Sequence, residues 1–135
     1  MTMRTRFKIS VYFLLFVMAS TGLGFLMWYN SVQIRDYKRL SDMTDIQSRL
    51  NIYFLHYSSY QVDGCSSGLI VSDCKGSADR PSFLGGITDQ LGGNYAYVFS
   101  ALSQNDYKVS FVLETKVGGF APGRYFLTPS GISDK

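Results

Sequence analysis

Apolar residues follow different patterns along this chain, and each pattern predicts a different element. Residues 9–29 form a run of 21 residues without a charged side chain. A helix of that length covers roughly 30 Å at about 1.5 Å per residue, which is the thickness of the hydrocarbon core of a bilayer. Trp28 and Tyr29 stand at its end, where aromatic side chains favour the membrane interface. The run therefore predicts a transmembrane helix.

Residues 30–60 continue the helix, because neither glycine nor proline occurs between Gly24 and Gly64. In this second part apolar side chains recur every three or four residues, the spacing of one helical face. Charged side chains occupy much of the remaining surface, so the segment predicts an amphipathic helix that packs through one face on the rest of the protein. The members of this predicted packing face are Tyr37, Leu40, Met43, Ile46, Leu50, Phe54 and Tyr57.

Beyond residue 95 the spacing of apolar residues changes to that of β-strands. Residues 95–102 and 107–115 are rich in aromatic and β-branched side chains, and the four residues between them predict a hairpin turn. A third run at residues 124–128 follows a glycine-rich turn. The predicted fold class is α+β, with a small antiparallel sheet and C-terminal tail over residues 95–135 covering the helix. In the second strand one face is apolar and predicts the sheet core, formed by Tyr107, Val109, Phe111 and Leu113.

Residues 61–94 show neither pattern and predict a connecting loop, which contains both cysteines of the chain. Cys65 and Cys74 frame a short polar segment, and an even number of cysteines in an exported domain predicts a disulfide. Closing so short a loop should contribute roughly 2–3 kcal/mol in the chain-entropy model. The alternative is a pair of free thiols in a cytosolic loop.

Charge indicates how the chain lies in the membrane. The net charge of +3 comes entirely from Arg4, Arg6 and Lys8, because the ten basic and ten acidic residues beyond Tyr29 balance. A neutral main part gives no support to nucleic-acid binding. By the positive-inside rule we expect residues 1–8 to be a basic cytoplasmic leader of a single-pass protein of the cytoplasmic (inner) membrane, with the remainder exported to the periplasm or cell exterior. The alternative is a signal peptide cleaved near Ala19, although the apolar run continues for ten residues beyond that site.

Residues capable of catalysis are sparse. His56 is the only histidine, and the chain contains neither a nucleophile elbow nor a phosphate-binding loop. We therefore expect no enzymatic activity and no cofactor. Five loop acids match no calcium-loop signature, so we expect them to be solvated, with a calcium site as the alternative. These acids are Asp63, Asp73, Asp79, Asp89 and Asp106.

Two segments resemble type IV pilin-like and type II secretion pseudopilin-like proteins. Residues 35–60 (RDYKRLSDMTDIQSRLNIYFLHYSSY) are similar to the helix of that family, and residues 95–114 (YAYVFSALSQNDYKVSFVLE) are similar to its sheet. The resemblance implies a long helix that anchors in the inner membrane and packs with copies of itself, while the sheet faces outward. It implies a structural subunit whose partners are membrane lipid and other pilin-like subunits or assembly-platform proteins. The alternative is an exported, membrane-tethered adhesin or ligand-binding module.

The N-terminus departs from the processing site of that family. A prepilin has a glycine before a phenylalanine-led helix with glutamate as its fifth residue, whereas here Arg6 precedes Phe7 and Val11 takes the place of the glutamate. A bulky charged side chain should hinder the close backbone approach that glycine permits. We therefore expect the mature protein to begin at or near Met1, and to act as an anchor or minor component instead of the repeating subunit of a long fibre.

Overall fold

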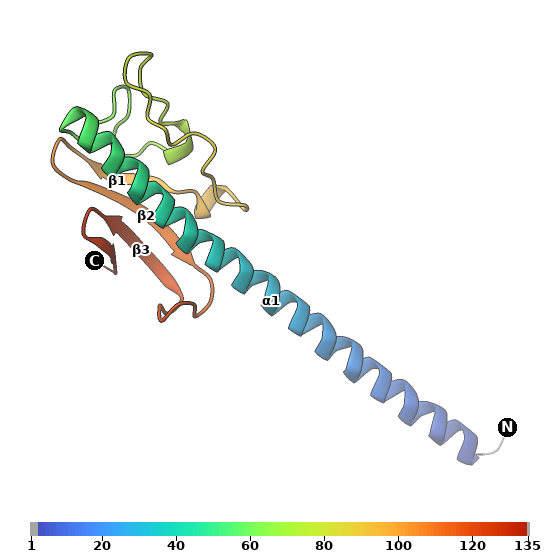
Figure 1. The fold of residues 1–135 in the computed structure, drawn as a ribbon. Helices are drawn as coiled ribbons and strands as arrows, with labels where there is room; N and C mark the ends of the chain where they lie inside the picture. The colour runs from blue at the N-terminus through green and yellow to red at the C-terminus, as the bar shows by residue number, and fades with distance from the viewer. Residues whose placement is uncertain (1–2, 135) are drawn as a thin grey trace.

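The computed structural model of the protein describes residues 3–134, with side chains described from residue 12 onward. One helix, α1 (Met3–Tyr57), projects far beyond a small four-stranded sheet (Figure 1). The strands are β1 (Val98–Leu102), β2 (Tyr107–Leu113), β3 (Gly123–Thr128) and β4 (Gly131–Ser133). They pair in chain order, each antiparallel to the next. The predicted α+β fold is therefore confirmed.

The helix α1 is unbroken over its 55 residues, about 80 Å at 1.5 Å per residue. Within the apolar half, Ser20 and Thr21 donate their hydroxyl hydrogens to backbone carbonyls one turn earlier, so these polar groups need no external partner. The helix ends after Tyr57, where Ser58 takes a left-handed conformation with φ of 53°. Its N–H group bonds the carbonyl of Phe54 at 2.7 Å, a common way to close a helix C-terminus.

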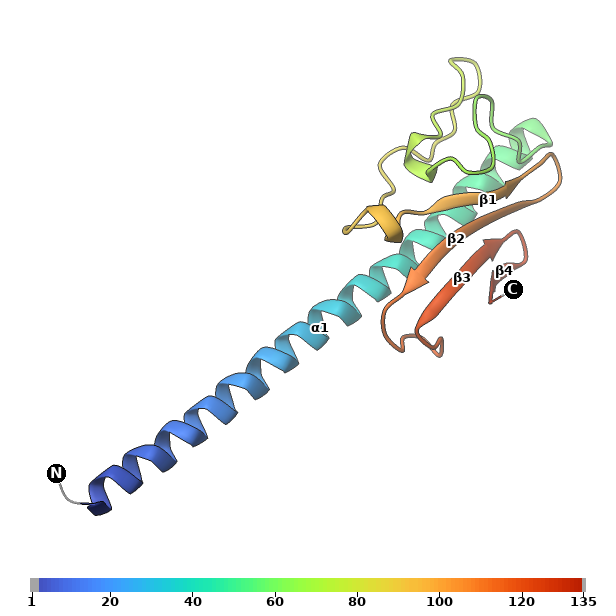
Figure 2. The same cartoon turned by 180° about the vertical axis from the view of Figure 1, so that it is seen from behind.

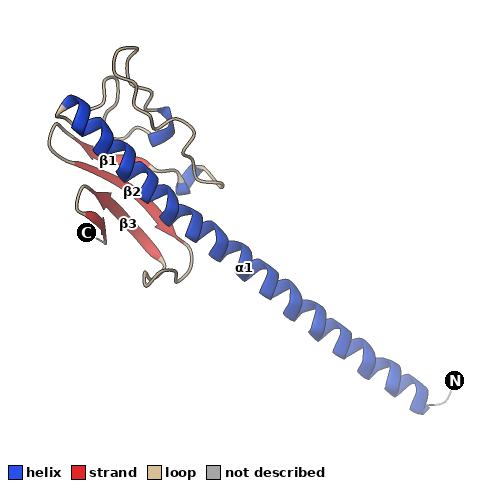
Figure 3. Ribbon diagram, viewed as in Figure 1, coloured by secondary structure: helices blue, strands red, loops and turns tan. Residues whose placement is uncertain are grey.

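The sheet is a meander (Figures 2 and 3), in which short turns join β1 to β2 and β3 to β4 and a longer loop, residues 114–122, joins β2 to β3. Leu102 pairs with Tyr107 across the predicted four-residue turn, which the Ser103 N–H closes by donating to the Asp106 carbonyl at 2.9 Å. The first strand begins at Val98, later than predicted, because residues 93–95 form the short 3₁₀ helix η2 (Gly93–Tyr95). The fourth strand was not predicted, because three residues are too few to show an alternation.

The hydrophobic core lies between α1 and the inner face of the sheet. All four predicted core positions of β2 are fully buried, and so are Met43, Ile46 and Leu50 of the predicted helix face. Leu40, Phe54 and Tyr57 pack against this core and are partly buried. These side chains of α1 and β2 fix the register of the helix on the sheet.

Tyr37 is the member of the predicted packing face that the structure contradicts, because its side chain is 59% exposed. The buried stripe of α1 instead continues toward the N-terminus through Arg39, Asp36 and Val32, which are all nearly inaccessible to solvent. The prediction followed apolar residues alone and therefore turned onto the neighbouring flank of the helix. Around Tyr37, the ion pair of Asp36 and Arg39 occupies the inward face of the helix.

The connecting segment between α1 and β1 covers the outer edge of β1. The N–H of Phe99 donates to the Leu69 carbonyl at 3.0 Å, and the N–H of Val71 donates to the Tyr97 carbonyl at 2.9 Å. The segment also contains the 3₁₀ helix η1 (Val71–Asp73). In this way β1 is shielded on one side, and the short β4 remains at the other edge of the sheet.

Candidate functional site

The N-terminal half of α1 has no partner in the described chain. Apolar side chains from Tyr12 to Tyr29 are exposed, and the helix is the one element of the described residues that is long and apolar enough to cross a membrane. Figure 1 shows this half extending away from the sheet along a straight path. An apolar surface of this extent is favourable only when lipid or protein covers it. The predicted transmembrane segment therefore stands as a candidate membrane span.

A cluster of buried charges joins the second half of α1 to the sheet. At its centre Arg39 is 1% exposed and donates to three carboxylates. Its Nε bonds Asp89 Oδ2 at 2.6 Å. Its Nη1 bonds Asp36 Oδ1 and Glu114 Oε1, both at 2.7 Å. The guanidinium also lies 4.6 Å from the ring centre of Tyr95. One side chain thus contacts the helix, the loop before β1 and the end of β2.

The side chain of Asp36 binds the backbone of the chain at the end of β2. It accepts hydrogen bonds from the N–H groups of Glu114 at 3.1 Å and Thr115 at 2.7 Å, and from the Thr115 hydroxyl at 2.8 Å. These donors lie just past Leu113, where β2 ends and its backbone would lack a partner. Arg35 adds two bonds to Glu114, each at 3.1 Å. The Asp36 carboxylate therefore caps the end of β2 and links it to the helix.

These contacts shift the titration of both carboxyl groups. Burial alone would raise the pKa of Asp36, but hydrogen bonds from Glu114, Thr115 and Arg39 outweigh it and lower the pKa. Burial likewise opposes ionisation of Glu114, and the bonds from Arg35 and Arg39 lower its pKa overall. Burial acts to lower the pKa of Arg39, whereas the three carboxylates raise it. Asp36, Glu114 and Arg39 are accordingly ionised at neutral pH.

A second buried polar contact lies one turn further along the helix. The hydroxyl of Tyr97 donates to Asp42 Oδ2 at 2.8 Å, and Lys38 forms an ion pair with the other oxygen of the same carboxylate. Burial, together with the bond to Asp42, raises the pKa of Tyr97. Arg39 and Asp42 of α1 thus bind the segment that leads into β1, through Asp89 and Tyr97.

This cluster is not among the features that the sequence predicts. Asp36 and Arg39 stand at the spacing of a helical ion pair, but the predicted amphipathic helix places charged side chains outside its packing face. Asp89, predicted to be a solvated loop acid, is 8% exposed and binds Arg39, so that prediction is wrong. A signal for the cluster was present in the sequence, because Val32, Asp36, Arg39 and Met43 follow one another at spacings of four, three and four residues. It places Asp36 and Arg39 in line with the buried apolar positions further along α1.

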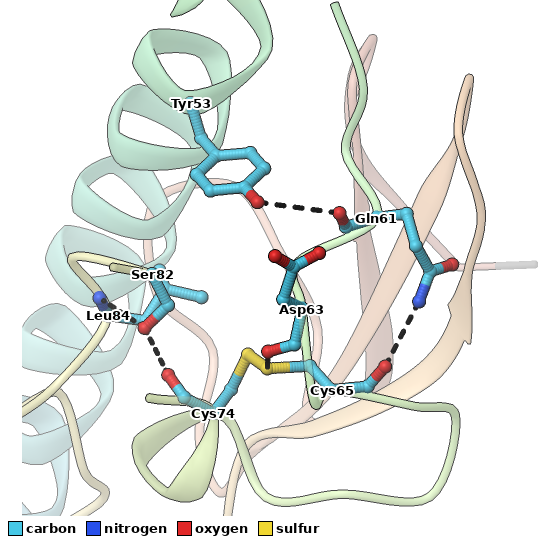
Figure 4. Close-up of a disulfide and its surroundings, with 7 residues drawn as sticks. All are labelled: Tyr53, Gln61, Asp63, Cys65, Cys74, Ser82 and Leu84. Atoms are coloured by element: carbon cyan, nitrogen blue, oxygen red, sulfur yellow. Dashed lines mark hydrogen bonds between the residues drawn. A yellow bond between two sulfur atoms is a disulfide. The ribbon is translucent and has the colours of Figure 1, made fainter. Parts of the chain in front are cut away.

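The predicted disulfide is confirmed, because Cys65 and Cys74 are bonded and both are buried. Figure 4 shows the bond beside α1, with Tyr53 pointing from the helix toward the connecting segment. The Gln61 amide donates to the Cys65 carbonyl at 3.0 Å, and the Ser82 hydroxyl donates to the Cys74 carbonyl. The bond therefore fixes the irregular segment of residues 61–82, which we call the disulfide lobe, against the helix. Within the described residues no group of three or more acidic, histidine or cysteine side chains is placed to hold a metal ion.

Comparison with models of protein families, with curated proteins and with solved structures finds no match to this chain. The arrangement itself is a pilin-like architecture: one long N-terminal helix, apolar in its first half, packs on a small antiparallel sheet through its second half.

Proposed function

We propose that this protein is a membrane-anchored, pilin-like structural subunit, which serves as a minor component or anchor of a type IV filament or secretion-type assembly. One observation carries the proposal. The helix α1 passes without a break from an exposed apolar half into a half that the sheet covers. We call residues 32–134, which comprise the covered half of α1, the connecting segment and the sheet, the head. A rigid connection of this kind couples the position of the head to that of the anchor, as a structural subunit requires.

The proposed orientation has residues 1–8 in the cytoplasm and the head outside the cytoplasmic membrane. The disulfide supports an exported head, because such bonds persist in oxidising compartments. Arg4, Arg6 and Lys8 support a cytoplasmic N-terminus. Residues 1 and 2 lie outside the described residues, and the structure describes no side chain of the basic leader.

The proposed partners are membrane lipid and other pilin-like subunits or assembly-platform proteins, and no catalytic role is proposed. If the basic leader is retained, moving its charges into an apolar environment would cost about 2.5–3.5 kcal/mol per charge. Such a subunit would resist extraction from the membrane, which suits an anchor better than the shaft of a long fibre.

Photo-crosslinking in the native cell tests this function. A photoreactive residue at Leu26, in the exposed apolar half of α1, should capture a pilin-like or platform protein. The matched position is Ser67, which is exposed on the disulfide lobe and should give little product. Capture of lipid alone from Leu26 would contradict a role in assembly.

An apolar hollow favours the alternative function as a ligand-binding module. Arg49, Ile52 and Phe83 line a surface hollow of about 260 Å³ beside the disulfide lobe. Phe83 takes a left-handed backbone conformation with φ of 58°, which is unusual for a bulky residue and occurs preferentially at functional sites. Capture of an external molecule by a photoreactive residue at Ile52, which lines the hollow, with no protein captured from Leu26, would support this alternative.

A further inference from the structure

The turn between β2 and β3, together with the first residues of β3, forms the end of the head nearest the exposed half of α1. We name this segment, residues 114–124, the basal turn. Figures 1 and 2 view the molecule from opposite sides, and both show the basal turn beside the helix on its N-terminal side of the sheet. Asp36 fixes its position by accepting the N–H groups of Glu114 and Thr115.

The head covers the helix almost as soon as the apolar run ends. Val32 is only 1% exposed, whereas Ser31 and Ile34 are exposed. Val32 lies three residues beyond Tyr29, or about 4.5 Å along the axis. The headgroup layer on each side of a bilayer is roughly 5–7 Å thick. If α1 spans the membrane through its apolar half, atoms of the head therefore lie within the headgroup layer.

Charge on this end of the head is unevenly distributed. The acids Asp36 and Glu114 are turned into the cluster around Arg39, while the basic residues Lys116 and Arg124 are exposed. Between them Phe120 is partly buried on the ring of Tyr125. The register of β4 on β3 places the exposed acid Asp134 nearby. The basal turn thus presents two basic groups beside an aromatic ring, a combination that suits an anionic membrane surface.

We propose that the basal turn docks on anionic phospholipid headgroups, so that the head lies on the membrane instead of standing clear of it. This inference rests on the proposed membrane anchoring. Membrane helices tilt by about 20° on average, so α1 can lean toward the side on which the basal turn lies. The exposed glycines Gly118 and Gly119 let the turn approach the surface closely, because they add no side chain. Docking would hold the head at one angle relative to the bilayer.

Amide hydrogen exchange of the full-length protein in lipid nanodiscs tests the proposal. Peptides covering residues 116–121 should exchange more slowly in discs containing phosphatidylglycerol than in discs of phosphatidylcholine, and high salt should remove the difference. The peptide around Gly68, on the disulfide lobe away from the bilayer, should exchange equally in both. Each basic residue near an anionic surface changes the docking equilibrium roughly fivefold. Lys116 and Arg124 together should therefore favour docking by at most about 30-fold, because the nearby Asp134 offsets part of the attraction.

The variant Lys116→Glu/Arg124→Glu should lose the lipid dependence, whereas Lys75→Glu, a reversal on the disulfide lobe, should keep it. Equal exchange in both lipids by an inserted wild-type protein would overturn docking. Slowing that depends on the number of protein copies per disc, and not on lipid charge, would also overturn it and indicate contact between chains. Failure of the protein to insert into discs would instead refute the proposed anchoring, so the two failures are distinguishable.

Discussion

Replacing Arg39 by leucine probes the buried cluster that holds the head on α1. The variant would leave the carboxylates of Asp36, Asp89 and Glu114 without their shared cation. The three carboxylates would retain different numbers of hydrogen-bond donors. Asp36 keeps its backbone donors and Glu114 keeps Arg35, whereas among the described residues Asp89 keeps only the N–H of Leu91.

The expected loss is large because the uncompensated charge is buried. Removing one partner of a buried ion pair typically costs about 3–5 kcal/mol, and Asp89 should account for most of it here. The matched control is the exposed pair Arg49–Asp45, whose side chains are 35% and 48% exposed. Truncating Asp45 should cost no more than about 1 kcal/mol. The two arms thus differ by several-fold in free energy.

Urea unfolding of the full chain in mild detergent, followed by near-UV circular dichroism of the buried tyrosines, measures both variants. The double variant Arg39→Leu/Asp89→Leu should recover much of the stability lost in the single variant, because it removes the stranded charge along with the cation. A loss below about 1 kcal/mol for Arg39→Leu, or a double variant less stable than the single, would refute this account of the cluster.

Three further predictions concern pH, an unsatisfied hydroxyl and the disulfide. The pKa values of Asp36 and Glu114 are lowered in the folded state from their ordinary values of 3.8 and 4.5, so their contribution to stability is present above about pH 4.5 and is lost as the pH falls through the folded-state values; a free energy of unfolding that stays constant from pH 6 to pH 3 would contradict this. The hydroxyl of Tyr107 is buried without a hydrogen-bond partner in the described chain, so Tyr107→Phe should leave stability unchanged or raise it by up to about 1 kcal/mol, and a loss above 1 kcal/mol would show that the hydroxyl has a partner. Cys65→Ala/Cys74→Ala should lower the free energy of unfolding by roughly 2–3 kcal/mol, and intact mass before and after alkylation should detect no free thiol in the native protein.

Periodic and covalent features could be predicted from the sequence. The continuous helix follows from the absence of glycine and proline between Gly24 and Gly64, and the inner face of β2 follows from apolar residues at every second position from Tyr107 to Leu113. The disulfide follows from an even cysteine count close together in the chain. Each of these signals is local, so each could be read without knowing how the chain packs.

The buried cluster could not be predicted in the same way, because its partners come from distant parts of the chain. Arg39 meets Asp89 and Glu114 across separations of 50 and 75 residues. A charged side chain is ordinarily solvated, and only the tertiary arrangement supplies the carboxylates that make its burial favourable. The misplacement of Tyr37 has the same origin, since the inward position at this level belongs to Asp36 and Arg39.

The proposed function requires that the apolar half of α1 span the cytoplasmic membrane and place the disulfide-bonded head outside. Paired fusions at the C-terminus, one to alkaline phosphatase and one to green fluorescent protein, test it most directly. Alkaline phosphatase becomes active only after export, whereas green fluorescent protein becomes fluorescent in the cytoplasm. The account predicts strong phosphatase activity and no fluorescence, with both fusions recovered in the membrane fraction after alkaline extraction. Fluorescence without phosphatase activity, or release of the fusions by alkali, would contradict it.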